Sequence, residues 1–163
     1  MKQLLSEKEI VKVFERFKKQ NPEPKSELEY SSPFTLLVAV VLSAQATDKS
    51  VNKVTRELFK VAKSPEQMVE LGEEKLIDYI RSIGLYKNKA HNVIGLSKML
   101  ISEFNSQVPS TREELEKLPG VGRKTANVVL LNAFNICEGI AGDTHAKRIS
   151  KRLGLSNHDD PLK

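Results

Sequence analysis

The sequence contains few of the residues that cross-link small folds. Its 163 residues include one cysteine and no tryptophan, and aromatic residues make up only 6% of the chain. A single thiol, Cys137, cannot form an internal disulfide, and three scattered histidines do not complete a zinc site with it. We therefore expect no metal ligands in this chain, and we interpret Cys137 as a buried, inert thiol.

Long hydrophobic runs are also missing. The longest apolar run, residues 34–42, is far shorter than the roughly 20 residues that a membrane helix requires. The N-terminus shows no basic stretch followed by an apolar signal core. With 39% hydrophobic and 29% charged residues, the composition is that of a globular chain with a sizeable core. We expect a cytoplasmic protein with no membrane partner.

Positive charge is concentrated in one part of the chain. The formal net charge is +5, and residues 117–152 carry seven basic side chains against two acidic ones. That stretch accounts for the whole excess, since the remaining residues hold 19 of each sign. Any attraction to a polyanion is therefore expected within this stretch, and the alternative is a solvated helical face.

Helix start signals recur along the chain, and no stretch alternates polar and apolar residues for long enough to predict a strand. Ser6 and Glu9 form a capping box before an amphipathic helix. The apolar face of that helix carries Ile10, Val13, Phe14 and Phe17. Ser32 and Pro33 open a helix that is apolar all round, which predicts a central, buried position. The fold class is predicted to be all-α.

Further helices are predicted to start at Thr47 or Asp48, at Ser64 and at Ser110 or Thr111. One helix is expected to end at Leu118 and the next to run over residues 123–134. The last helix is expected to begin near Asp143 or Thr144 and to end at Gly154.

Two glycines flank Val121 in the turn of residues 119–122. They allow backbone angles closed to other residues, so the chain can turn sharply here and aim its amides outward. The start of the next helix favours phosphate, because its first amides lack partners and the helix dipole is positive there. Charge and a hydroxyl are added by Arg123, Lys124 and Thr125. The alternative is a tight connection between two helices without a ligand.

A nucleotide phosphate loop is excluded by spacing. That motif needs a glycine five residues before its last glycine, where this chain has Lys117, and it needs a strand leading in. A capped helix leads in instead, which also excludes the dinucleotide fingerprint. A phosphate of the DNA backbone fits the turn, and a tight connection without a ligand stays the alternative.

Residues 118–126, followed by Asp143, Thr144 and His145, resemble the helix-hairpin-helix DNA glycosylases, specifically the endonuclease III family. The resemblance extends to residues 42–48 and 83–86. It implies a six-helix lobe over residues 22–136, with the helix-hairpin-helix at 110–134. The second lobe would be incomplete, made from a first helix in residues 1–21 and from residues 137–163.

The resemblance also implies a function. Family members excise oxidised pyrimidines from duplex DNA and then cleave the strand at the abasic site. For this chain it implies a bacterial-type monomer that associates with the nucleoid through double-stranded DNA carrying a damaged base or abasic site. Adenine glycosylase relatives lack a lysine at the position of Lys124, so this lysine argues against that subgroup.

Two residues match the family's catalytic positions. Lys124 would be the amine that attacks the anomeric carbon of the sugar, displaces the base and forms a Schiff base. Asp143 would be the carboxylate that stabilises an oxocarbenium-like sugar or helps to deprotonate the lysine. Without the resemblance, Lys124 is a phosphate contact and Asp143 a helix cap.

Two further residues match side chains that fill the gap left by a displaced base, namely Gln45 and Leu85. Without the resemblance, Gln45 is a polar residue at a helix end and Leu85 a buried leucine. The predicted DNA-binding set consists of Gln45, Leu85, Gly120, Val121, Gly122, Arg123, Thr125 and His145.

The chain departs from the family at two points. Complete members hold a 4Fe-4S cluster with four cysteines near the C-terminus, and Cys137 does not correspond to any of them. Gly142 stands where the family has a bulkier apolar residue, which would loosen the backbone at Asp143. We expect a truncated protein without a cofactor and with impaired activity. The alternative is a noncatalytic DNA-binding module that retains the hairpin.

Overall fold

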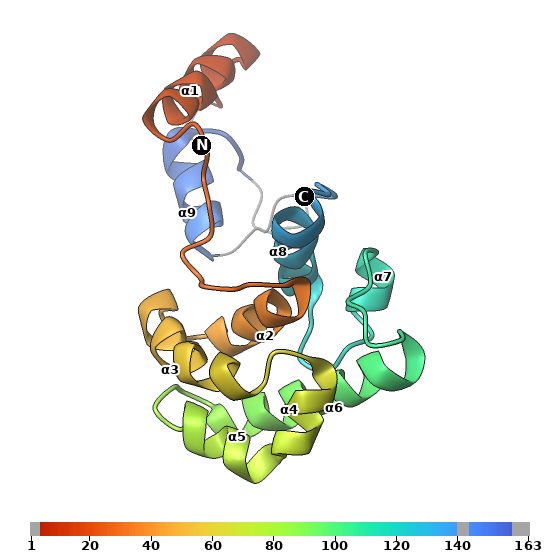
Figure 1. Ribbon diagram of the computed structural model, residues 1–163. Coiled ribbons are helices and arrows are strands. Elements are labelled where there is room, and N and C mark those ends of the chain that lie inside the picture. The colour runs from red at the N-terminus through yellow and green to blue at the C-terminus, as the bar shows by residue number, and fades with distance from the viewer. Residues whose placement is uncertain (1–3, 140–143, 158–163) are drawn as a thin grey trace. The chain divides into compact units, whose positions relative to one another are not determined.

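The computed structural model describes residues 4–139 and 144–157, which form nine helices and no strand. This result confirms the predicted all-α class (Figure 1). The helices are α1 Glu7–Gln20, α2 Pro33–Ser43, α3 Asp48–Val61, α4 Pro65–Leu71, α5 Glu73–Ile80, α6 Tyr86–Glu103, α7 Arg112–Leu115, α8 Arg123–Phe134 and α9 Thr144–Leu153. The chain divides into two compact units, which we name by their place in the sequence alone: the inner unit, Ser26–Ile140, and the outer unit, residues 1–25 and 141–163.

The core of the inner unit is built around α2. The Ser32 hydroxyl accepts a hydrogen bond from the Thr35 amide, and Pro33 occupies the first turn, so the helix starts where the sequence predicts. Every residue from Phe34 to Leu42 is buried. The helix packs against α3, α6 and α8, which surround it in Figure 1. The predicted central helix is confirmed.

Three other helix starts of the inner unit are capped by hydroxyl side chains, as predicted. Thr47 accepts from the Ser50 amide at α3, Ser64 caps α4, and Thr111 caps α7. These caps fix where each helix begins, because each satisfies an amide that lacks a partner inside the helix.

The end predicted for α7 is wrong: the helix stops at Leu115 rather than Leu118. The amides of Lys117 and Leu118 bond to carbonyls only three residues back, at 3.2 and 3.0 Å. Such bonds are typical of a 3-10 turn rather than of an α-helix. Pro119 follows and has no amide hydrogen with which to continue the helix.

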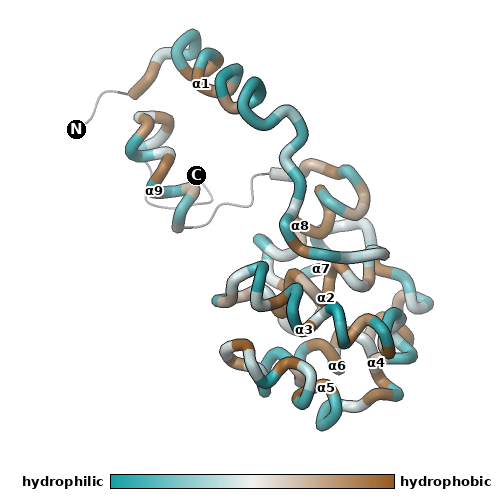
Figure 2. Tube along the Cα trace, turned by 60° about the vertical axis from the view of Figure 1, so that its left-hand side comes forward, coloured by the Kyte–Doolittle hydropathy of each residue, from teal (hydrophilic) through white to brown (hydrophobic). Residues whose placement is uncertain are grey.

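The outer unit contains α1 and α9. The capping box of Ser6 and Glu9 is present at α1, and the Leu5 amide donates to the Gly154 carbonyl at 2.9 Å. Figure 2 shows the amphipathic pattern along α1, yet none of its residues is buried. Phe14 is 54% exposed, and its ring meets that of Phe17 edge to face at 6.1 Å between centroids. Among the described residues, no helix is long and apolar enough to cross a membrane.

Candidate nucleic-acid interface and active site

The hairpin turn between α7 and α8 is closed by a hydrogen bond from the Val121 amide to the Leu118 carbonyl, at 3.1 Å. Gly120 has φ +77°, in the left-handed region that favours glycine. Gly122 has φ −99° and ψ 177°, which is extended backbone open to any residue. Of the two glycines, Gly120 uses an angle closed to other residues and Gly122 does not. A Cβ added there would also meet no atom within 4 Å.

The start of α8 has no side-chain cap. Its N-cap residue is Gly122, whereas α2, α3, α4 and α7 each begin at a hydroxyl that accepts an amide hydrogen bond. The first amides of a helix have no acceptor inside it, and the helix dipole is positive at this end. Arg123 and Lys124 are exposed on the first turn of α8, and Thr125 is half-buried. Val121, in the hairpin turn, is buried in the core. An anion is the ligand that this arrangement favours.

Gln45 and Leu85 both occupy helix connections in left-handed conformations, with φ of 53° and 58°. Gln45 follows the end of α2, and Leu85 directly precedes α6. Both side chains are exposed, and for Leu85 the exposed fraction is 56%. The alternative of a buried leucine is therefore wrong. Non-glycine residues hold such angles at a cost, and they occur preferentially at functional sites.

The other predicted site residues fall in different parts of the chain. Asp143 and Gly142 lie outside the described residues. His145 is exposed on α9 in the outer unit, where its Nδ1 lies 2.9 Å from the Arg148 guanidinium. Lys124 belongs to the inner unit.

Comparison with known proteins identifies the family. Residues 38–163 match the family described as HhH-GPD superfamily base excision DNA repair protein. Endonuclease III of Rickettsia conorii is 55% identical over 152 residues, which cover 93% of this chain and 72% of that protein. This chain belongs to the endonuclease III family. The predicted family is confirmed, and so is the enzyme class: a DNA glycosylase of base excision repair, in a family typically active also as a lyase.

Solved structures of endonuclease III share the fold. One is a non-covalent complex of endonuclease III with DNA, 49% identical, with a TM-score of 0.91 over 98% of this chain and 74% of that chain. Another is a trapped covalent intermediate of endonuclease III with DNA, with the same identity and TM-score, covering 98% of this chain and 75% of that chain. The predicted helix-hairpin-helix glycosylase fold is confirmed.

Members of the endonuclease III family generally carry a 4Fe-4S cluster, which requires four thiolates. The 163 residues contain one cysteine, so they do not supply those ligands. No group of three or more His, Cys, Asp or Glu side chains within residues 4–139 and 144–157 could hold a metal ion. Cys137 is exposed rather than buried, a correction explained by its place in the segment that leaves the core after α8.

Two buried polar side chains of this endonuclease III relative were not singled out from the sequence. Lys89 on α6 is 4% exposed, and burial lowers its pKa. Asn127 on α8, 7% exposed, stands one turn after Lys124. Within the described residues, neither the Lys89 Nζ nor the Asn127 Oδ1 has a hydrogen-bond partner. A polar residue in the apolar stripe of a helix is the signal that could have pointed to both.

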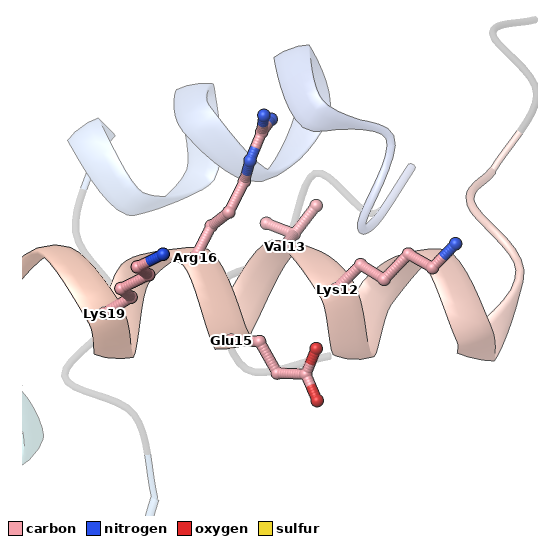
Figure 3. Close-up of a pocket in the computed structure, with 5 residues that line it drawn as sticks. All are labelled: Lys12, Val13, Glu15, Arg16 and Lys19. Atoms are coloured by element: carbon pink, nitrogen blue, oxygen red, sulfur yellow. The ribbon is translucent and has the colours of Figure 1, made fainter.

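An open groove on α1 contains none of the predicted site residues. It is lined by Lys12, Val13, Glu15, Arg16 and Lys19. Figure 3 shows Glu15 pointing away from Val13 and Arg16. The groove holds three cations but no nucleophile beside a base, so its residue types do not indicate a catalytic site.

Proposed function

We propose that the chain removes oxidised pyrimidines from duplex DNA and cleaves the resulting abasic site through a Schiff base on Lys124. The observation that carries the proposal is the uncapped start of α8, which places exposed Lys124 directly after an open glycine turn. A phosphate bound at that start brings the neighbouring deoxyribose close to the amine. The proposed partner is double-stranded DNA, bound by one copy of the chain.

Gly122 is proposed to give the DNA backbone access to the start of α8. The fold alone does not require glycine there, since its angles are ordinary and a Cβ would meet open space. The missing side chain instead lets a phosphate oxygen approach the amides at the start of α8. Arg123 and Thr125 stand on the same turn and add a cation and a hydroxyl to the grip.

Lys124 supplies the proposed chemistry. Its neutral amine forms a bond to the anomeric carbon of the sugar, while the glycosidic bond breaks and its electron pair leaves with the base. Loss of the amine proton and opening of the sugar ring then give the Schiff base. We assign the family's carboxylate role to Asp143, which stabilises positive charge on the sugar or removes the proton.

The displaced base leaves a gap that Gln45 and Leu85 are proposed to fill. Both side chains are exposed, and both residues hold left-handed backbone angles. A flipped base costs stacking energy of a few kcal/mol, and an inserted side chain offsets part of it. His145 is proposed to contact the DNA from α9.

Borohydride trapping on abasic duplex DNA tests the proposal. The parent chain should give a covalent complex, and Lys124→Arg should lose it while keeping noncovalent binding within about tenfold, since the charge at phosphate is retained. Lys117→Arg is the matched control, because Lys117 is an exposed lysine on the other side of the same turn. A parent chain that binds the duplex without being trapped would instead be a noncatalytic module. Normal trapping by Lys124→Arg would place the nucleophile elsewhere.

A further inference from the structure

The hairpin turn rests on α6 at two points. A Cβ added at Gly95 would lie 3.2 Å from Cγ of Pro119, so the proline ring packs directly on this helix. A Cβ added at Gly120 would lie 2.9 Å from both Cβ and Nδ2 of Asn92. The Asn92 side chain therefore occupies the space beside the turn. Residue 120 is limited to glycine by this contact as well as by its positive φ.

Asn92 has hydrogen-bonding capacity that the chain does not use. Its side chain is half-buried, and within the described residues the side-chain amide has no hydrogen-bond partner. A primary amide carries two donor hydrogens on Nδ2, and a phosphate oxygen is a strong acceptor. The donors stand beside exposed Gly120, in the turn that leads to the uncapped start of α8.

We propose that Asn92 is part of the phosphate site: it packs on Gly120 to hold the turn, and it donates from Nδ2 to the DNA backbone. The inference rests on the proposed function, because it needs DNA at the hairpin. The contact is neutral and sequence-independent, so Asn92 strengthens binding to every duplex without adding to the charge that displaces counterions. Packing against the turn fixes the amide before DNA arrives, so little side-chain freedom is lost on binding.

The decisive variant is Asn92→Leu, which keeps the shape of the side chain and removes its donors. We expect duplex binding to weaken roughly 10- to 100-fold, the effect of losing one hydrogen bond to a charged group. The weakening should be equal for abasic and undamaged duplexes of different sequence. The slope of log K against log salt should stay unchanged, whereas Arg123→Ala should reduce it by about one. The melting temperature should match the parent's.

The matched control is Asn132→Leu on α8. Asn132 is also half-buried, but its Nδ2 already donates to the Val128 carbonyl at 2.8 Å, so its loss should leave DNA binding unchanged. Asn92→Ala provides a second variant that removes both shape and donors, and it should weaken binding at least as much as Asn92→Leu.

Parent-like binding by a folded Asn92→Leu would overturn the donor role. If Asn92→Leu does not fold, parent-like binding by Asn92→Ala would overturn it equally. A parent chain that binds no duplex at all would refute the proposed function and this inference together. Loss confined to the Asn92 variants, with trapping at saturating DNA retained, supports the inference.

Discussion

Gly120 and Gly122 stand two residues apart in the hairpin, and the structure predicts different defects when each is given a side chain. At Gly120, φ is +77° and an added Cβ would lie 2.9 Å from two atoms of Asn92. At Gly122, the backbone is extended and the surrounding space is open. Gly120→Ala should therefore damage the fold, while Gly122→Val should spare the fold and damage DNA binding.

The magnitudes follow from these geometries. Left-handed backbone costs a non-glycine residue about 1 to 2 kcal/mol, and the overpacked contact with Asn92 adds roughly 1 to 3 kcal/mol at Gly120. Valine is comfortable at the extended angles of Gly122 and costs only about 1 kcal/mol as a poorer N-cap. Its methyl groups would hold a phosphate oxygen away from the first amides of α8. Loss of one such charge-assisted hydrogen bond corresponds to a roughly 10- to 100-fold weaker complex.

Two measurements separate the defects. Urea unfolding reports the free energy of unfolding, and fluorescence anisotropy with a labelled duplex reports binding at fixed salt. Gly122→Val should bind abasic and undamaged duplexes of any sequence more weakly in the same proportion, because backbone amides do not read bases. Parent-like binding by folded Gly122→Val would refute the hairpin as the DNA grip. Parent-like stability of Gly120→Ala would refute the contact with Asn92.

Three further predictions concern side chains outside the hairpin. Lys89→Met should stabilise the fold by about 1 to 3 kcal/mol at pH 7, because it removes a buried, unpartnered ammonium. Because the pKa of Lys89 is lower in the folded chain, the unfolded chain binds more protons than the folded chain at pH values between the two pKa values. The parent should therefore regain stability towards pH 10, and its difference from Lys89→Met in urea unfolding should shrink. Phe14→Ala should cost under 1 kcal/mol and Leu37→Ala about 2 to 5 kcal/mol in the same assay, because only Leu37 is buried. The Arg56 guanidinium lowers the pKa of Glu29, so Arg56→Gln should return that pKa to its ordinary value in an NMR titration; equal pKa values in both proteins would contradict the ion pair.

Local signals account for the parts of the fold that the sequence predicts well. Ser32, Thr47, Ser64 and Thr111 each cap the helix that follows them, because a hydroxyl needs only an amide three residues on. The end of α7 is predicted wrongly, because the amides before Pro119 bond to carbonyls three residues back and the apolar pattern does not indicate this change. Boundaries made by competing turn geometries depend on the tertiary path of the chain.

The candidate site shows the same division. The turn at residues 118–122 and the lysine after it are adjacent in sequence, so their motif could be recognised directly. The different conformations of Gly120 and Gly122 could not, since the letters are identical and only the contact with α6 distinguishes them. Asn92 was missed for the same reason, because it reaches the turn from a helix far along the chain. Asp143 and the DNA-binding roles stay predictions.

Gln45 and Leu85 set a limit on how far this chain can be made more stable without losing activity. Each holds a left-handed angle that glycine would adopt without steric cost, so local stability favours glycine at both places. A glycine there would also delete the exposed side chain that is proposed to enter DNA. Selection for thermal stability alone would therefore favour glycine at these two turns, which gives a more stable protein that lacks the side chains proposed to enter DNA.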